Sequence, residues 1–132
     1  MTEGSVKPVG PVELTVPASS EHLRVLRLVS ASLAASVGLD VDQLDDLRIA
    51  VDELCAQLLE HAPSGGRLCL TLCGEDGRLT ADGVLVDDAP VDRIDPVSQM
   101  ILDGLDVELH SGAPSASFRL VAPGKVERDD VT

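Results

Sequence analysis

Acidic and amide side chains recur along one side of a helix that the sequence predicts between residues 40 and 62. Asp46, Glu53 and Glu60 are spaced seven residues apart, and Gln57 lies within the same row. Residues seven apart are separated by about two helical turns, so their side chains line up along one side of a helix. A row of this composition is suited to a catalytic edge that faces a ligand, and it is also typical of a solvated helix surface. The residue types alone leave both interpretations open.

Three cysteines and one histidine are the other side chains considered as metal ligands. Cys69 and Cys73 could be combined with His61, but no close cysteine pair has the spacing of a zinc site. Cys55 falls on the apolar side of the predicted helix, where a thiol is inert. An odd number of cysteines in a chain that shows no secretory signal favours reduced thiols and a cytoplasmic location. The sequence therefore predicts structural cysteines and no metal site.

The helix that carries the acidic row needs an apolar stripe to hold it in place. It is expected to begin near Asp40 or Asp42 and to end at about Ala62, because a proline and two glycines follow. At 100° per residue its apolar side chains share one arc of roughly 100°, the width of a core stripe. Glu53 and Gln57 are expected to point away from this stripe. The stripe consists of Leu44, Leu47, Val51, Leu54, Cys55, Leu58 and Ala62.

Period-two and helical patterns divide the rest of the chain into further elements. The segment 12–17 alternates apolar and polar side chains, as a half-buried strand does. A helix capped by Ser19 or Ser20 follows and ends at Gly38. Its core stripe consists of Leu23, Leu26, Ser30, Leu33 and Val37. The remaining expected elements are strands at 67–73 and 78–86 joined by a four-residue turn at 74–77, a short helix from Pro96, and strands at 106–110 and 115–123.

The order of strand, helix, helix, strand, strand, short helix, strand, strand predicts the fold class. Helices combined with hairpin-linked strands favour an α+β two-layer sandwich, in which a mainly antiparallel sheet is covered by helices on one face. The chain length fits one domain with one core. We expect a flexible N-terminal tail at 1–11, a single domain at 12–122 and a flexible C-terminal tail at 123–132.

The charge balance restricts the partners that this chain can bind. It contains 10 Lys and Arg against 23 Asp and Glu, a net charge of −13, and a single aromatic residue. Such a chain repels the phosphates of nucleic acids and anionic lipids, and it offers no aromatic platform for base stacking. It also lacks an apolar run of the ~20 residues that a membrane helix needs. The composition therefore predicts a protein partner, with no nucleic acid and no membrane.

The first half of the chain resembles a known protein family. The segments "ELTVPASSEHLRVLRLV" and "GLDVDQLDDLRIAVDELCAQLLEHAP" are similar to the small serine kinases that act as anti-sigma factors. These kinases belong to the histidine-kinase-like ATPases and have the Bergerat ATP-binding fold. Their helix pattern A-x-x-E-x-x-x-N-x-x-x-H-A is matched at four positions, namely Ala50, Glu53, His61 and Ala62. Gln57 stands at the asparagine. The resemblance covers about residues 12–122 and implies this fold with a shortened lid region.

The resemblance also implies the chemistry of the site. In this family the glutamate is the base that orients or deprotonates the attacking hydroxyl, and the asparagine holds the Mg²⁺ that bridges the ATP phosphates. Glu53 would be that base, and Gln57 would occupy the magnesium position. ATP and magnesium are therefore the cofactors of one alternative, an active serine kinase that phosphorylates an anti-sigma factor antagonist.

Three departures from the family pattern argue against nucleotide chemistry. Gln57 is one methylene longer than asparagine, which displaces its oxygen from octahedral magnesium geometry. Gly83 and Leu85 align with the Asp and the first Gly of the family's adenine-binding Asp-x-Gly-x-Gly turn. The segment 87–95 has no glycine for a phosphate-binding lid, and it lacks the glycine and terminal glutamate of a calcium loop. Its four carboxylates would repel a triphosphate. They belong to Asp87, Asp88, Asp92 and Asp95.

We therefore interpret the chain as a degenerate anti-sigma-factor-like domain, a pseudokinase that regulates transcription by protein binding and uses no cofactor. Its expected partner is a sigma factor or an anti-sigma factor antagonist. Arg24 and Arg27, three residues apart on the first helix, are the candidate partner contacts, unless they are only solubilising charges. Two further interpretations stay open. One is the active kinase, and the second is a structural module that forms homodimers, as members of this family commonly do.

Overall fold

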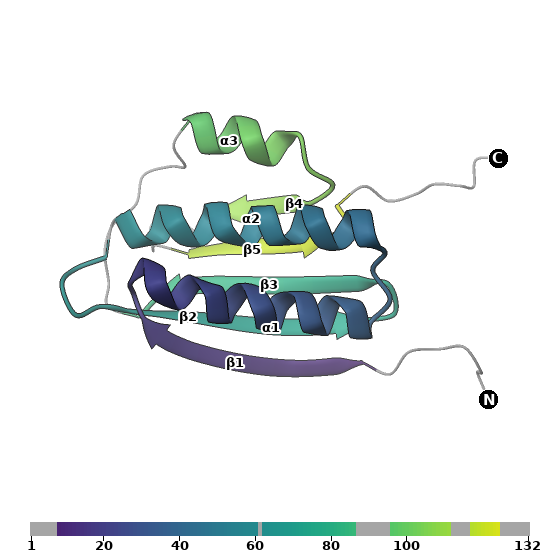
Figure 1. The fold of residues 1–132 in the computed structure, drawn as a ribbon, viewed down its shortest axis with the longest axis horizontal. Helices are drawn as coiled ribbons and strands as arrows, with labels where there is room; N and C mark the ends of the chain where they lie inside the picture. The colour runs from purple at the N-terminus through teal and green to yellow at the C-terminus, as the bar shows by residue number, and fades with distance from the viewer. Residues whose placement is uncertain (1–7, 61, 87–95, 112–116, 125–132) are drawn as a thin grey trace.

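Five segments with alternating apolar side chains form one antiparallel sheet (Figure 1). The computed structural model of the protein describes residues 8–60, 62–86, 96–111 and 117–124. The strands are β1 (Val9–Pro17), β2 (Arg67–Glu75), β3 (Arg78–Leu85), β4 (Glu108–Ser111) and β5 (Ser117–Ala122). Their order across the sheet is β1-β2-β3-β5-β4, and every neighbouring pair is antiparallel. The alternate residues Leu68, Leu70 and Leu72 of β2 are fully buried, so one face of the sheet forms the floor of the core.

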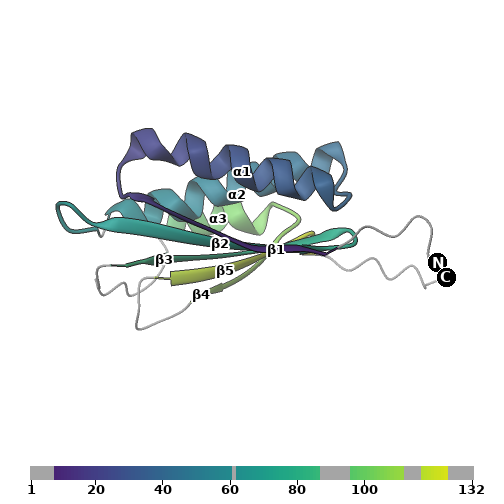
Figure 2. The same ribbon diagram turned by 90° about the horizontal axis from the view of Figure 1, so that it is seen from below.

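Three α-helices pack on the same face of the sheet (Figure 2). They are α1 (Leu23–Ser36), which follows a short 3-10 helix (Ser20–His22), α2 (Val41–Glu60) and α3 (Pro96–Asp103). In Figure 1, α2 lies between α1 and α3 and runs along the sheet. This architecture confirms the predicted order of elements and the predicted α+β two-layer sandwich, with an antiparallel sheet and helices on one face.

The turn between α1 and α2 is fixed by backbone conformation and by a reciprocal cap. Gly38 has a φ of 96°, a left-handed value that favours glycine, and it follows the end of α1 as the sequence predicts. The side chain of Asp40 accepts a hydrogen bond from the N–H of Gln43 (2.8 Å). The side chain of Gln43 accepts one from the N–H of Asp40 (2.9 Å). This capping box starts α2 at the expected position.

The β2–β3 hairpin turns more tightly than the sequence predicts. A four-residue turn is expected at 74–77, but Glu75 and Arg78 are still paired, which leaves a two-residue turn between them. Gly74 and Glu75, which the sequence places in the turn, are therefore the last two residues of strand β2. The N–H of Gly77 in this turn donates a hydrogen bond to the carbonyl of Val37 (2.6 Å). The hairpin is thereby joined to the end of α1.

The core contains aliphatic side chains and one phenylalanine. Most of the predicted stripe residues of α1 and α2 are buried, and Ala34 and Ala50 are fully buried in addition. The hydroxyl of Ser30 is also buried, and it donates a hydrogen bond to the carbonyl of Leu26 (2.8 Å), which satisfies it. Burial raises the pKa of the Cys55 thiol to about 12, with a contribution from a nearby carboxylate. Cys55 is therefore protonated and inert at neutral pH, as expected of a structural cysteine.

The first strand begins earlier than the sequence predicts. β1 starts at Val9, and its pairing with β2 contains a bulge between Val9 and Val12. Residues 9–11, expected in the N-terminal tail, are therefore strand, because the bulge lets pairing continue past the Gly-Pro dipeptide. Most of the remainder of the two predicted tails, residues 1–7 and 125–132, lies outside the described residues. No helix in the described part of the chain is long and apolar enough to cross a bilayer.

Candidate functional site

The acidic row predicted on α2 lies along the flank of the helix that faces away from α1. Asp52 lies on the flank of α2 that faces α1, where it pairs with Arg27. Asp46 lies on the opposite flank and accepts a hydrogen bond from the backbone N–H of Asp106, just before β4. Glu53 lies on the flank of Asp46, because seven residues separate the two. Figure 1 shows α3 beside this flank. We call it the α3 flank of α2 and define it by Asp46, Ala50, Glu53 and Gln57.

Gln57 is buried, so the interpretation of the row as a solvated helix surface does not hold at this position. The residue is only 9% exposed. Ala50, seven residues earlier and therefore almost in line with it along the helix, is fully buried. The helix packs against the sheet and also against α3, so its α3 flank is covered as well as its apolar stripe. The buried surface of α2 is thus wider than the arc that its apolar residues define.

Glu53 and Gln57 lie one turn apart and place a carboxylate beside a carboxamide. Glu53 is half-buried, and both residues make interactions within the chain. Glu60, further along the row, is exposed. A carboxylate can act as a base and a carboxamide can donate and accept hydrogen bonds, so this pair retains groups that can do chemistry. Among the described residues no group of three or more His, Cys, Asp or Glu could hold a metal ion. His61 and the aspartates of 87–95 lie outside the described residues.

Asp46 has a structural role at the start of the row. Its Oδ2 accepts a hydrogen bond from the backbone N–H of Asp106 at 2.9 Å, across 60 residues of sequence. The carbonyl of Asp106 accepts a hydrogen bond from the N–H of Gly124 (2.9 Å), so both backbone groups of Asp106 are satisfied. Asp46 therefore ties α2 to the segment that leads into β4 and to the end of β5.

Replacing Asp46 with alanine is expected to lower the free energy of unfolding by about 1–3 kcal/mol, because a part-buried N–H loses its charged acceptor. Urea denaturation followed by circular dichroism measures this change. Asp45→Ala is the matched control, since Asp45 makes an exposed ion pair with Arg48, and such pairs contribute less than about 1 kcal/mol. Equal losses of stability in the two variants would contradict the structural role of Asp46.

The resemblance places an adenine-binding carboxylate at residue 83. There the space for a side chain is occupied by a residue of the neighbouring strand. Gly83 lies within β3 and is paired with Phe118 of β5. A Cβ atom at Gly83 would lie 2.5 Å from two ring carbons of Phe118, so the ring occupies the space that a side chain would need. Leu85, aligned with the first glycine of the family's turn, is buried in the core. The residues at these two positions therefore do not fit an adenine contact.

A second candidate site is a groove between α1 and α2 on the outer surface of the helices. Arg27 Nε donates to Asp52 Oδ1 at 2.9 Å, and the two side chains are 36% and 42% exposed. Arg48 Nη1 donates to Asp45 Oδ1 at 3.1 Å. These four side chains and Ile49, which is 44% exposed, line a hollow of about 250 Å³. We call this hollow the α1–α2 groove.

The lining of the groove combines an exposed apolar side chain with charged ones. Ile49 lies among two arginines and two aspartates. Apolar contacts surrounded by polar and charged groups are typical of protein interfaces. Of the two arginines predicted to contact a partner, Arg27 lines the groove, whereas Arg24 is exposed on α1 outside its lining. The groove can therefore contact a protein through both apolar groups and charge.

Most of the groove residues are not among the site residues that the sequence predicts. The sequence does contain signals for the groove. Ile49 is an apolar residue that lies opposite the apolar stripe of α2, on a face that is otherwise polar. Asp45 and Arg48 are also spaced for an ion pair on one helix. The pairing of Asp52 with Arg27 has no local signal, because 25 residues separate them and only the packing of α1 on α2 brings them together.

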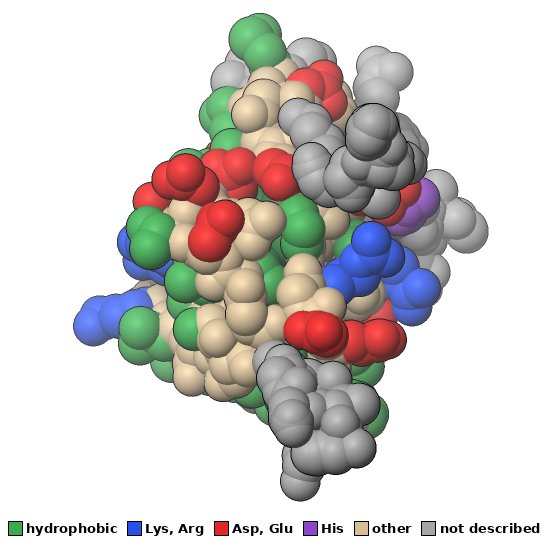
Figure 3. Space-filling model, turned by 90° about the vertical axis from the view of Figure 1, so that its right-hand side faces the viewer, with side chains coloured by type: hydrophobic (Ala, Val, Ile, Leu, Met, Phe, Trp, Pro, Cys, Tyr) green, Lys and Arg blue, Asp and Glu red, His purple; other side chains and the backbone are tan. Residues whose placement is uncertain are grey.

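Acidic side chains gather at the end of the molecule where α2 begins (Figure 3). Asp40 lies just before α2, and Asp42 lies in its first turn. Asp45 and Asp46 follow in the next turn. The positive end of the helix dipole stabilises carboxylates at this position. The Lys and Arg side chains visible in Figure 3 stand on two opposite sides of this acidic end. Each of the two arginines of the α1–α2 groove is paired with an aspartate, so the groove carries no net charge on a strongly acidic protein.

The fold and the α2 motif agree with a match to a known family. Residues 16–99 match the family model described as the histidine kinase-like ATPase domain. The match runs from the end of β1 into α3 and covers more than half of the chain. The chain therefore belongs to the histidine kinase-like ATPase domain family.

Curated proteins that match part of this chain include serine-protein kinases. The serine-protein kinase RsbW of Halalkalibacterium halodurans is 39% identical over 61 residues, which are 46% of this chain and 38% of the relative. RsbW of Bacillus pumilus is 30% identical over 77 residues, 58% of this chain and 44% of the relative. The matched segment spans less than half the length of these relatives. The chain is thus similar to RsbW proteins over about half of its own length.

Proposed function

We propose that this protein is an anti-sigma-factor-like regulator that acts by binding a protein partner and carries out no nucleotide chemistry. The observation that carries this proposal is the contact of the Phe118 ring with Gly83. At the position where the resemblance expects an adenine-binding carboxylate, the chain has no side chain, and the space for one is already occupied. Gln57 at the family's magnesium position supports the same conclusion, because its side chain is one methylene longer than asparagine, which displaces its oxygen from octahedral magnesium geometry.

The α1–α2 groove is the surface that we assign to the partner. Arg27 is held by Asp52, and the exposed apolar side chain of Ile49 lies in the same lining. Arginines and apolar groups that become desolvated on binding contribute most of the affinity of protein interfaces. The partner class follows from the RsbW similarity and the anti-sigma resemblance. We expect a sigma factor or an anti-sigma factor antagonist, and we expect the protein to act in the cytoplasm.

Mg-ATP separates this proposal from the alternative of an active serine kinase that uses Glu53 and Gln57. A ligand at 100 times its dissociation constant stabilises the native state by about 2.7 kcal/mol, which raises the melting temperature by several degrees. We expect no shift of the melting temperature in millimolar Mg-ATP, with a nucleotide-binding RsbW protein as the positive control. In the same buffer without nucleotide, calorimetric titration against purified sigma factors and antagonists of the same genome should find one that binds.

Two outcomes would contradict the proposal. A clear Mg-ATP shift together with phosphate transfer to a bound antagonist would establish the kinase instead. If Glu53→Gln then abolished transfer and kept the shift, Glu53 would be the base. Failure of every sigma factor and antagonist to bind would remove the regulatory role, whatever the response to Mg-ATP.

A further inference from the structure

The outward side of α3 carries apolar side chains that the core does not use. The helix is anchored in the domain by Leu102, which is 3% exposed, and it packs against α2. Met100 and Ile101 are instead 70% and 40% exposed. Gly104 follows one turn after Met100, is exposed and adds no side chain. We call this surface the outer face of α3 and define it by Met100, Ile101 and Gly104.

The packing of the domain does not explain the apolar outer face of α3. A helix at the surface normally directs one apolar stripe to the core and polar residues to solvent. Met100 is two residues before Leu102, which places it almost on the opposite side of the helix. Methionine is flexible and adapts to the shape of a contacting surface, so it is common in protein-binding sites. The outer face of α3 therefore has the composition of an interaction surface.

Acidic side chains border the outer face of α3. Asp103 is exposed and is the last residue of the helix. Asp46 of α2 is tied to the segment that follows α3 through the N–H of Asp106 (2.9 Å), and Asp42 lies one turn before Asp46. The chain has no Lys or Arg in the whole segment 94–118. Figure 3 shows hydrophobic side chains next to acidic ones on the α3 side of the molecule.

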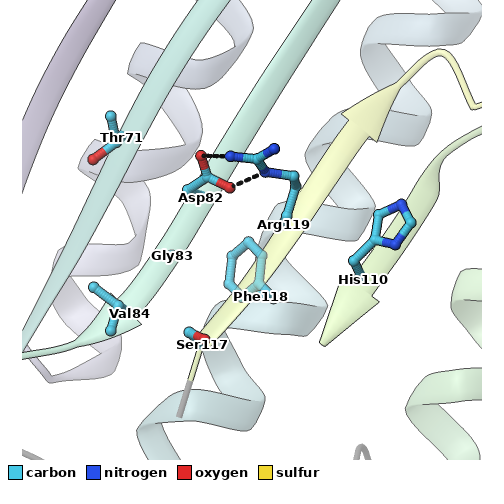
Figure 4. Close-up of a pocket in the computed structure, with 8 residues that line it drawn as sticks. All are labelled: Thr71, Asp82, Gly83, Val84, His110, Ser117, Phe118 and Arg119. Carbon is cyan, nitrogen blue, oxygen red and sulfur yellow. Dashed lines mark hydrogen bonds and ion pairs between the residues drawn. The ribbon is translucent and has the colours of Figure 1, made fainter. Parts of the chain in front are cut away.

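These carboxylates lack the counter-ions that acids have elsewhere on the surface. On the face of the sheet opposite the helices, Asp82 accepts hydrogen bonds from Arg119 Nε at 2.7 Å and Nη2 at 3.2 Å (Figure 4). Asp42, Asp46 and Asp103 make no ion pair with any residue that the structure describes. Asp103 also lies at the C-terminal end of α3, where the helix dipole favours a positive charge. The border is therefore complementary to cationic groups of another molecule.

We propose that the outer face of α3 binds a cationic amphipathic segment of a protein partner. Apolar side chains of this segment pack on Met100 and Ile101, and its lysines or arginines pair with the three aspartates of the border. The net charge of −13 attracts such a segment and accelerates its association. The proposed function uses the α1–α2 groove, whose lining residues are all different, so the two proposals can fail independently.

A synthetic amphipathic peptide of leucine and lysine is the probe for this surface. In one control peptide serines replace the leucines, and in a second glutamates replace the lysines. Fluorescence anisotropy of the labelled peptides at physiological ionic strength measures their affinity for the protein. We expect the serine–lysine peptide to bind at least about tenfold more weakly than the leucine–lysine peptide, because salt screens charges that act without apolar contact. The leucine–glutamate peptide should not bind, since it meets like charges.

The double variant Met100→Ala with Ile101→Ala tests where the peptide binds. It removes exposed apolar surface and keeps every charge, so the affinity for the leucine–lysine peptide should fall at least about tenfold. Leu28→Ala is the matched control, because Leu28 is 62% exposed on α1. This variant should bind the peptide normally, and so should Arg27→Ala, which changes the α1–α2 groove. Circular dichroism melting checks that the variants fold.

Backbone amide shifts of the nitrogen-15-labelled wild type locate the peptide without any variant. The largest changes are expected at residues 100–104 and around Asp42 and Asp46. Failure of the leucine–lysine peptide to bind, or equal binding of the serine–lysine peptide, would overturn the proposal. Equal affinity of the wild type and the double variant would also overturn it. Binding that Arg27→Ala abolishes would place the segment in the α1–α2 groove instead.

Discussion

Replacing Gly83 with alanine is expected to lower the free energy of unfolding by about 2–3 kcal/mol, a large effect for one methyl group. The added Cβ would lie 2.5 Å from Cε2 and Cζ of Phe118, well inside van der Waals contact. The ring cannot simply swing away, because Phe118 is 5% exposed and packed in the core. Either the ring or strand β3 must therefore shift. Guanidinium denaturation of the two proteins measures the difference.

The cause of this loss can be separated from a general effect of glycine substitution. Gly104→Ala is the matched control, because the nearest atom to its added Cβ is 3.6 Å away and its φ is not left-handed. In a Phe118→Leu background the smaller side chain leaves room, so Gly83→Ala should cost clearly less than in the wild type. Equal costs in the two backgrounds would show that the ring is not the obstacle.

The same contact explains why this strand cannot supply the family's adenine-binding acid at residue 83. An aspartate there would meet the ring and would also place a carboxylate among core side chains, where an unpaired charge is costly. Gly83→Asp is therefore expected to be less stable than Gly83→Ala. The packing of Phe118 therefore supports the proposal that the chain makes no adenine contact at this position.

Replacing Arg27 with alanine is expected to weaken binding of the proposed partner by at least about 30-fold, or about 2 kcal/mol, if the α1–α2 groove is the binding surface. Arg27 is the groove residue that α1 contributes, and Asp52 fixes its guanidinium beside the exposed Ile49. Calorimetric titration with the partner found by the binding experiment measures the loss. Arg78→Ala, which removes an exposed arginine at the start of β3 outside the lining of the groove, should bind normally.

Stability measurements distinguish a contact residue from a structural one. The Arg27–Asp52 pair is more than one third exposed, so Arg27→Ala should change the free energy of unfolding by less than about 1 kcal/mol. Asp52→Asn keeps the shape of the side chain and releases the guanidinium from its charged partner. A change in affinity without a change in melting temperature supports the contact role. A loss of affinity that only follows a loss of stability would argue against it.

The sequence by itself determined the elements and the family. The spacing of the leucines in α2, the start of this helix near Asp40 or Asp42, and Gly38 after α1 are local signals, and the structure confirms each of them. Hydrophobic period reports which side of an element faces the core, and this information is sufficient for the order of elements and the two-layer class. The motif around Glu53 then pointed to the family to which the chain belongs.

Only the tertiary structure decided what surrounds the candidate site. The period of α2 identifies its stripe, but it cannot indicate that α3 covers one flank, so Gln57 is buried against expectation. The contacts that define the sites join residues far apart in sequence: 25 residues for Arg27 and Asp52, and 60 for Asp46 and Asp106. No local pattern encodes such pairs, because they form only when separate elements pack. The side chain that fills the space at Gly83 likewise comes from another strand.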